Sequence, residues 1–275
     1  MTSLRTFTRR RMLALGSLIP TLALEGCTAP PIAVPSGTPV PGLDPNPAPP
    51  SMAPASSTSV APGIARVPRP PAGKGVYSVP VDGNYVMWTV DDGGDAATVR
   101  RYAEMARETG SRLVFFPNAQ YSGWAEAADI LRPMVRSGQV QIGNHTYSHA
   151  DLTSLSDQGI IDELMRNDEA LTALFGVSTK PYYRPPFGFR NDHTDAVAAA
   201  IGFTTPIMWY GSLSDSGLIT KEQVLEFANQ WFIPGHVVIG HANHQSVCDV
   251  FPQLLKLLRE RSLTTVTLDD VFAKA

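Results

Sequence analysis

Short apolar runs rich in β-branched and aromatic residues alternate with helical patterns from residue 73 to residue 275. The runs are Tyr85–Val90, Leu113–Phe116, Val140–Gly143, Tyr182–Tyr183, Pro206–Tyr210, Val237–Gly240 and Thr264–Leu268. Between them apolar residues recur every three or four positions, which predicts helices over Ala96–Thr109, Gly123–Ser137, Asp157–Phe175, Thr194–Ile201, Lys221–Trp231 and Val247–Arg261. Strands that alternate with helices indicate parallel pairing through crossover helices. We therefore expect a single α/β domain, a distorted or incomplete (β/α) barrel with about seven parallel strands.

The N-terminus follows neither pattern. A basic start with the pair Arg9-Arg10 precedes an apolar run over Met12–Leu24, and Cys27 follows closely. This order predicts an export signal over residues 1–26, and its arginine pair resembles a twin-arginine signal. Its end resembles a lipobox, which predicts that Cys27 is lipidated and holds the exported chain on the outer side of a membrane. An ordinary secretory signal with an incidental cysteine, and hence a secreted protein, is the alternative.

Residues 27–72 are rich in proline and poor in charge, and they hold 14 of the 24 prolines. Such a segment cannot bury enough apolar surface to fold. It predicts a disordered tether that extends on the order of 100 Å. A tether of that length would let a membrane-bound domain reach into a cell wall.

The charge and the cysteines exclude some classes of partner. The whole chain has a net charge of −3, and residues 1–26 carry four Arg and one Glu, so their removal leaves a more acidic chain. An acidic protein is a poor ligand for nucleic acid. Cys27 and Cys248 are the two cysteines. Lipidation of Cys27 would leave no intrachain disulfide, and Cys248 would be a buried, inert thiol. We expect a monomer.

Polar residues follow several of the predicted strands. They are Asp91-Asp92-Gly93 after the first strand, His145-Thr146-Tyr147-Ser148-His149 after the third, Arg184 after the fourth, Trp209 and Asp215 after the fifth, and His241 at the end of the sixth. In a β/α barrel the carboxyl ends of the strands form one face, where the active site lies. Residues far apart in the sequence are thus expected to converge there.

Each motif has an ordinary interpretation when taken alone. Asp-Asp-Gly is a common turn, and His145 and His149 could be two unrelated surface or core residues. Taken together, two carboxylates and two imidazoles can bind a divalent cation and leave one carboxylate free to accept a proton. On a helical turn, a spacing of four would place both histidines on one face. An arginine such as Arg184 can orient a carboxylate, and His241 is a candidate general acid.

The ordered motifs resemble those of the polysaccharide deacetylases, carbohydrate esterase family 4 or the NodB-homology domain, and the N-terminus resembles a bacterial lipoprotein-type member. The matching segments are Thr89–Gly93, His145–His149, Arg184–Phe187 and Ile239–His241. The resemblance implies that Asp92, His145 and His149 bind a divalent metal, zinc or alternatively cobalt or manganese. It implies that Asp91 is the general base, oriented by Arg184, and that His241 is the general acid. Trp209, Ile239, Phe187 and Tyr147 would contact the substrate.

The implied activity is the metal-dependent removal of N-acetyl groups from a glycan that contains N-acetylglucosamine, such as peptidoglycan or another cell-envelope polysaccharide. An O-acetyl esterase acting on xylan and a catalytically weak, glycan-binding pseudoenzyme are the alternatives. The sequence departs from the family at Ser212, where many members have an aspartate three residues after the tryptophan. Asp215 is expected to pair with His241 instead and to raise its pKa.

Overall fold

The computed structural model describes residues 63–274. The predicted export signal, Cys27 and most of the predicted tether lie outside these residues. None of the helices in the described part is long and apolar enough to span a bilayer.

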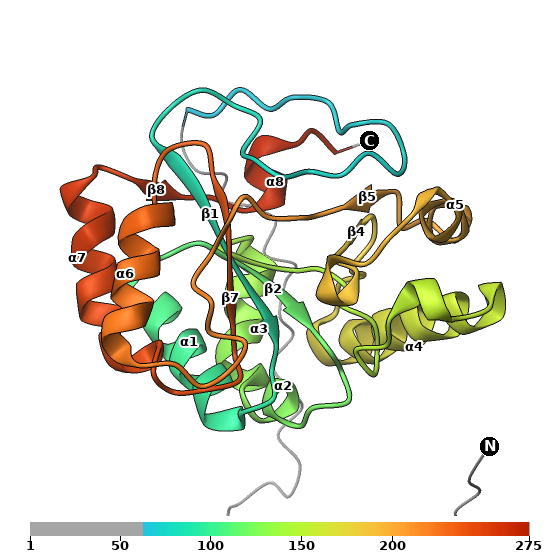
Figure 1. The fold of residues 1–275 in the computed structure, drawn as a ribbon, viewed down its shortest axis with the longest axis horizontal. Coiled ribbons are helices and arrows are strands. Elements are labelled where there is room, and N and C mark those ends of the chain that lie inside the picture. Colours follow the sequence, from blue (N-terminus) through green and yellow to red (C-terminus); the bar gives the residue numbers. More distant parts are fainter. Residues whose placement is uncertain (1–62, 275) are drawn as a thin grey trace, which may run out of the picture. The chain divides into compact units, whose positions relative to one another are not determined.

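A parallel sheet with β1 (Tyr85–Asp92) at its centre forms the core of the domain (Figure 1). The strand order is β3-β2-β1-β7-β6, and β8 also pairs with β1. The other strands of this sheet are β2 (Leu113–Pro117), β3 (Val140–Ile142), β6 (Gly211–Ser212), β7 (Val237–His241) and β8 (Thr264–Thr265). A second sheet pairs β4 (Tyr182–Tyr183) with β5 (Thr205–Pro206), also in parallel. The predicted α/β class and parallel strands are thereby confirmed.

The strands of the described residues form no closed sheet, so the predicted barrel is not confirmed. The two sheets meet at the single bridge Asn144–Tyr183, and β5 pairs with β4 but not with β6. The N-terminal segment occupies the remaining space, since Val76 bridges to Ile207 of the link between β5 and β6. The apolar run expected as one strand over Pro206–Tyr210 is therefore interrupted: β5 ends at Pro206, Ile207 forms an isolated bridge, and β6 begins at Gly211.

Several helices have the predicted bounds because their ends carry strong capping residues. These are α1 (Ala96–Thr109), α4 (Asp157–Phe175) and α6 (Lys221–Trp231). In α1 the Asp95 carboxylate accepts the backbone N–H of Thr98, and Gly110 ends the helix in the left-handed conformation. In α4 the Ser156 side chain accepts the backbone N–H of Gly159, and Gly176 ends the helix in the left-handed conformation.

Other predicted elements are divided or shortened. The helix expected over Gly123–Ser137 is split at Ala127 into α2 (Gly123–Glu126) and α3 (Ala128–Ser137). The strand expected over Thr264–Leu268 is two residues long and is followed by α8 (Leu268–Val271). The remaining helices are α5 (Asp192–Ala200) and α7 (Phe251–Glu260), which follows a 3-10 turn at Cys248–Val250.

Both faces of the sheet are covered. Alternate residues of β1 point to opposite sides, so Trp88 packs among the aromatic rings of Tyr102 and Phe251, whereas Met87 packs in a second cluster with Leu268 of α8. Figure 1 shows α6 and α7 to the left of β1 and α8 to the right of its upper end, and residues of α8 belong to the second cluster. Burial on both faces is typical of parallel sheets and leaves the strand ends as the accessible edge.

Two further residues bear on the predicted organisation. Cys248 is buried, and burial raises the pKa of its thiol to about 12, in agreement with an inert side chain.

Val67 lies within the predicted tether, yet it forms a parallel bridge with Phe272, and its N–H donates to the Val271 carbonyl at 2.9 Å. The end of the Pro-rich segment thus packs on the domain at α8.

Candidate active site

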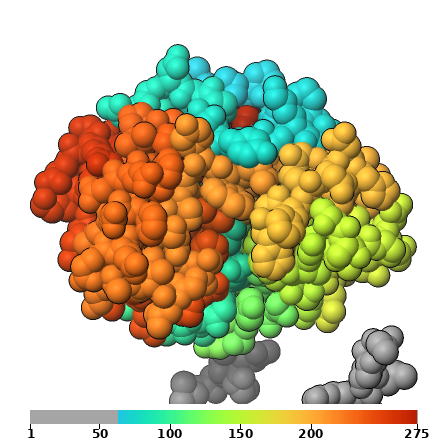
Figure 2. Space-filling model, viewed as in Figure 1, coloured from blue at the N-terminus to red at the C-terminus, as the bar shows by residue number. Residues whose placement is uncertain are grey.

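The carboxyl ends of β1 and β7 open into a cavity of about 480 Å³. Figure 2 shows this face of the molecule hollowed between the yellow and orange parts of the chain. Most of the predicted site residues line the cavity: Asp91, Asp92, His145, His149, Phe187, Trp209, Ile239 and His241. The expected convergence at the strand ends therefore occurs without a closed barrel.

The two adjacent aspartates both face the cavity. In regular extended backbone neighbouring side chains point to opposite faces, so two such residues would diverge. Asp92 instead has a φ of 69°, which ends the strand and brings its carboxylate alongside that of Asp91. The indole N–H of Trp124 donates to the Asp92 carbonyl at 2.8 Å and holds this turn.

Asp92, His145 and His149 have the geometry of a metal-ligand set. The Asp92 Oδ1 atom lies 3.3 Å from His145 Nε2 and 3.4 Å from His149 Nε2. Ligand atoms around a tetrahedral zinc ion lie about 3.3–3.4 Å apart, since each sits about 2.0–2.1 Å from the ion. Asp92 Oδ1 is also buried without a hydrogen-bond partner, which is costly unless a cation neutralises it. The donor set therefore fits a divalent cation.

A second contact fixes the orientation of His145. Its Nδ1 atom lies 2.7 Å from the carbonyl oxygen of Arg184, which can only accept a hydrogen bond. Nδ1 therefore carries the proton, and Nε2 presents its lone pair to the cavity.

The His145–His149 segment is not helical, contrary to the arrangement considered from its spacing. Thr146 and His149 have φ values of 64° and 62°, and the two rings meet edge to face at 4.9 Å between centroids. The Asn144 side chain accepts the Thr146 N–H at 2.9 Å, and Asn118 donates to the carbonyls of His145 and Thr146. Buried amides, rather than helical periodicity, bring the two imidazoles together.

Asp91 forms an ion pair with Arg184, whose guanidinium is completely buried. The Arg184 Nη1 atom lies 2.6 Å from Asp91 Oδ1 and also donates to Thr89 Oγ1 at 2.8 Å. The other guanidinium nitrogens donate to the carbonyls of Ile207 and Met208. Burial lowers the pKa of Arg184, but the charge of Asp91 opposes this shift. The arginine thus fixes one oxygen of Asp91 and leaves the other, Oδ2, facing the cavity side at 3.6 Å from His145 Nε2.

His241 lies beside Asp91, because the two residues are register partners in the β1–β7 pair. Its Nδ1 atom is 3.0 Å from Asp215 Oδ1, as the sequence predicted, and its backbone N–H donates to Asp215 Oδ2 at 3.3 Å. Burial lowers the pKa of His241, but the hydrogen bond and charge of Asp215 outweigh it and raise the pKa above its usual value. Ser212 accepts the N–H of Ser214 in the turn that brings Asp215 to this position.

The surroundings shift the pKa values of His145 and His149 in opposite directions. Burial raises the pKa of Asp92, but the neighbouring His145 outweighs it and holds the pKa well below its usual range. Burial lowers the pKa of His145 too, and here Asp91 and Asp92 outweigh it. For His149, burial and the charge of His145 both act to lower the pKa. The low pKa of Asp92 keeps this carboxylate ionised, as metal ligation requires.

Three predicted residues do not line the cavity. Arg184 and Asp215 lie behind it and act through Asp91 and His241. Tyr147 turns away, and its ring packs against the Arg166 guanidinium at 3.7 Å.

Phe187 does line the cavity, and it stands at the edge. It has a φ of 59° and its side chain is 58% exposed, while its ring lies 4.6 Å from that of His149. An exposed aromatic ring beside the ligand set gives the opening an apolar rim.

The sequence did not reveal the amides that hold the site. Asn118 and Asn144 orient the histidine loop, and Asn243 donates from Nδ2 to Asp92 Oδ2 at 2.7 Å while its Oδ1 accepts the Gly94 N–H. Asn144 precedes His145 directly, but Asn118 and Asn243 lie 27 and 151 residues from the groups they hold. Only the fold brings these groups into contact.

Residues 78–206 match the model of the polysaccharide deacetylase family. Among curated relatives, a peptidoglycan-N-acetylglucosamine deacetylase of Bacillus cereus is 24% identical over 203 residues, 71% of each chain. A chitin deacetylase of Arthroderma benhamiae is 27% identical over 213 residues, 73% of this chain and 54% of the relative.

Solved structures agree in fold. A peptidoglycan N-acetylglucosamine deacetylase bound to a hydroxamate-type ligand has a TM-score of 0.65 at 21% identity and covers 73% of this chain and 94% of its own. A CE4 family pseudoenzyme from Bacillus anthracis has a TM-score of 0.63 at 19% identity, with coverage of 73% and 70%. These structures show that the chain shares the fold of CE4 proteins, and residues 78–206 are similar to the polysaccharide deacetylase family.

Proposed function

We propose that this chain is a metal-dependent deacetylase that removes N-acetyl groups from a glycan containing N-acetylglucosamine. The observation that carries the proposal is the different environment of two adjacent carboxylates. Asp92 has a buried oxygen without a donor between two imidazole nitrogens, whereas Asp91 is held by Arg184. One carboxylate is suited to a metal and the other to a proton.

Asp92, His145 and His149 would hold the cation, with zinc the first choice for this ligand set and cobalt or manganese the alternatives. When bound, a divalent cation supplies Lewis acidity that polarises the acyl carbonyl and acidifies a neighbouring water molecule.

The chain's own residues would move the protons. Asp91, oriented by Arg184, accepts a proton from the attacking water. His241, kept protonated by Asp215, donates a proton to the departing nitrogen on the other side of the scissile bond. The indole of Trp209 and the side chain of Ile239 give the cavity an apolar wall that suits the acetyl methyl group.

Two other functions are alternatives to amide hydrolysis. The same groups can hydrolyse an O-acetyl ester, as on xylan. A glycan-binding pseudoenzyme is suggested by Ser212, but the base, the acid and the ligand set are all present, and Asp215 supplies the carboxylate next to His241. These contacts favour an active enzyme.

The cellular setting is a further part of the proposal. An export signal over residues 1–26, a lipidated Cys27 and a Pro-rich tether would place the domain at the cell envelope, where peptidoglycan is the accessible N-acetylated polymer. Mass spectrometry of the mature N-terminus tests this directly. An unmodified cysteine at the N-terminus, or cleavage elsewhere, would contradict lipid attachment.

Acetate release tests the activity. The purified protein, stripped of metal and supplied with zinc, cobalt or manganese, should release acetate from N-acetylglucosamine oligomers or peptidoglycan. Acetate from acetylated xylan alone would overturn amide hydrolysis. Stoichiometric metal without acetate from any of these substrates would favour a binding protein.

The two aspartates can be distinguished by matched substitutions. Asp91→Asn should lower the turnover number by about a thousandfold or more while the metal stays bound, because only the proton acceptor is lost. Asp92→Asn should instead lose the metal. Metal content by mass spectrometry and acetate release provide the two measurements, and the reverse outcome would show that the two roles are exchanged.

A further inference from the structure

Two exposed phenylalanines stand at the opening of the active-site cavity. Phe187 lines the cavity and is 58% exposed, and Phe189, which does not line it, is 54% exposed. Their ring centroids lie 5.7 Å apart, with an angle of 43° between the ring planes. Because Phe187 also contacts His149 at 4.6 Å, the aromatic side chains form a row that leads outward from the ligand set. We call Phe187 and Phe189 the aromatic pair.

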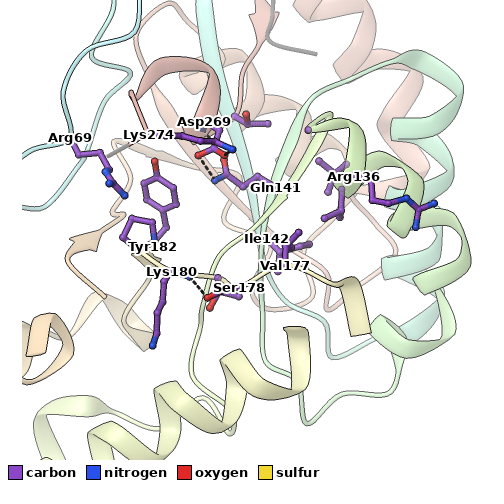
Figure 3. Close-up of a pocket in the computed structure, with 16 residues that line it drawn as sticks. Arg69, Arg136, Gln141, Ile142, Val177, Ser178, Lys180, Tyr182, Asp269 and Lys274 are labelled. Atoms are coloured by element: carbon purple, nitrogen blue, oxygen red, sulfur yellow. Dashed lines mark hydrogen bonds and ion pairs between the residues drawn. The ribbon is translucent and has the colours of Figure 1, made fainter. Parts of the chain in front are cut away.

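A larger cavity elsewhere in the domain differs in this respect. It has a volume of about 620 Å³, lies along β3 and shares no lining residue with the active site (Figure 3). Among the described residues that line it, Tyr182 is the one aromatic residue, and it is only 3% exposed. That cavity offers a ligand no open aromatic face, whereas the active-site cavity continues into one.

A tight turn at Gly188 joins the two phenylalanines. Phe187 and Gly188 both have left-handed backbone conformations, with φ values of 59° and 74°. A Cβ atom at position 188 would lie 3.0 Å from the Trp209 ring, so glycine lets the turn pack directly against the cavity wall. A bulky residue in the left-handed region is strained, and such strain is concentrated at functional sites. The turn thus leaves both phenylalanine rings at the surface.

Buried polar contacts hold this turn on both sides. Before the turn, the Arg184 guanidinium is completely buried and donates to Asp91 at 2.6 Å. After the turn, Arg190 Nε donates to Asp195 Oδ1 at 3.0 Å, and both side chains are largely buried. The aromatic pair is therefore fixed in position before a ligand binds, which reduces the entropy lost on binding.

The two sides of the opening differ in character. Phe187 belongs to the yellow part of the chain and Ser212 and Ser216 to the orange part, and Figure 2 shows the hollow between these parts. One side therefore presents an aromatic ring and the other presents serine residues. A sugar has matching surfaces, since its C–H groups form an apolar face and its hydroxyl groups lie at the edge. Apolar contacts with a few polar groups are typical of ligand sites.

We propose that the aromatic pair is a sugar-binding site beside the catalytic centre, in which Phe187 contacts the reacting sugar and Phe189 stacks on a neighbouring sugar of the same chain. The spacing of the two rings is comparable to that of successive sugars in a β-linked chain. An aromatic ring buries a large apolar area when a flat C–H face covers it. The site rests on the proposed function and extends it, because the substrate is then a chain of several sugars.

Direct binding tests the site without reference to turnover. The probe is the linear tetramer of N-acetylglucosamine, titrated by calorimetry into zinc-loaded Asp91→Asn protein, in which hydrolysis is slowed. Addition of Phe189→Ala should weaken tetramer binding by about fivefold or more. Single N-acetylglucosamine, which is too short to reach Phe189, should bind equally to both proteins. Equal affinity for the tetramer, or an equal loss for the single sugar, would overturn the proposal.

Matched substitutions separate ring stacking from simple apolar contact. Phe189→Trp keeps a flat ring and should retain tetramer binding, whereas Phe189→Leu should bind as weakly as Phe189→Ala. Tyr210→Ala removes a ring that is 59% exposed, packs on His236 and does not line the cavity, so it should leave binding unchanged. Thermal unfolding verifies that all variants fold. Full binding by Phe189→Leu would overturn ring stacking.

A lipid surface is the competing ligand for an exposed apolar pair. Vesicles of phosphatidylglycerol, sedimented with the protein, are expected to bind equally to the parent and to Phe189→Ala. Vesicle binding that is lost in Phe189→Ala while tetramer binding stays unchanged would assign the pair to a membrane and overturn the proposal.

Kinetics then distinguish the sugar site from the proposed activity. In the active protein, Phe189→Ala should raise the KM for the tetramer by about fivefold or more and leave kcat unchanged, because the neighbouring sugar is bound equally in substrate and transition state. Hydrolysis of 4-nitrophenyl acetate, which carries no sugar, should not change. Acetate release that does not depend on Phe189 would refute the sugar site alone. Tetramer binding that depends on Phe189, without acetate from any substrate, would refute the proposed activity and leave the sugar site intact.

Discussion

The left-handed backbone at Asp92 decides how the two neighbouring carboxylates are used. It brings both side chains to the same cavity, where the fold supplies different partners: histidines for Asp92 and a buried arginine for Asp91. A β-branched residue could not adopt this φ without strain, whereas aspartate tolerates it. The chemistry of the pair thus depends on one unusual torsion angle.

The pairing of Asp215 with His241 predicts a change in the pH profile. An acid must be protonated, so activity should fall as the pH rises through the pKa of His241. Because Asp215 raises that pKa, Asp215→Asn should shift the alkaline limb of kcat/KM to lower pH by about one unit. Asp249→Asn, which removes a carboxylate far from the cavity, is the control. An unmoved alkaline limb would show that His241 is not the acid.

The amide of Asn243 predicts an effect on metal affinity. Its Nδ2 atom holds Asp92 Oδ2 and so directs Oδ1 to the histidines. Asn243→Ala should weaken zinc binding by about 10- to 100-fold, as for other residues that orient a ligand. Competition with a chromophoric chelator measures this directly. Retained affinity would mean that the histidines alone position Asp92.

Among the elements, the loop after β3 is the least regular part of the site. The buried side chain of Asn118 donates to two carbonyls of this loop, and removing it leaves both without that donor. Asn118→Ala should lower the free energy of unfolding by about 1–3 kcal/mol. Urea denaturation measures the change, and Asn229→Ala, which removes an exposed side-chain amide on α6, should have little effect. Equal losses in both variants would contradict a specific role for Asn118.

The sequence predicted elements well where local signals decide their ends. The bounds of α1 and α4 follow from capping residues that lie next to the helix, such as Asp95 and Gly176. The sequence predicted the backbone poorly where distant contacts determine it, as at Thr146, whose carbonyl accepts a hydrogen bond from Asn118, 28 residues away. The same limit applies to the site: the motif residues carry a local signal, whereas the supporting amides do not.

The expected barrel, distorted or incomplete, is not confirmed for a related reason. The alternation of strands and helices predicts the number of strand–helix units, but it does not show whether the last strand pairs with the first to close a barrel. Here β4 and β5 are two residues each, and the N-terminal segment at Val76 pairs next to β5. Neither strand length nor that pairing is visible in the apolar pattern.

At the scale of the whole molecule, one buried ion pair joins the C-terminus to the sheet. Arg112, before β2, holds both carboxylate oxygens of Asp270 in α8 at 2.6 and 2.7 Å, and the pair is largely buried. Asp270→Ala should lower the free energy of unfolding by about 3 kcal/mol, because it leaves a buried guanidinium without its carboxylate.

An exposed ion pair gives the matched control for that measurement. Glu260→Ala breaks the pair with Lys256 on the surface of α7 and should cost less than about 0.5 kcal/mol. Chemical denaturation of both variants decides the question. Similar small changes in the two would show that α8 is held by its apolar contacts alone.

The register of β1 against β7 has a consequence for how such an enzyme can diversify. Asp91 and His241 are neighbours in that register, so main-chain hydrogen bonds fix the separation of the proposed base and acid. Phe187 and Ser216, in contrast, belong to loops that line the opening. Mutations in these loops can therefore change the shape of the opening to suit a different polymer, while the separation of Asp91 and His241 stays constant.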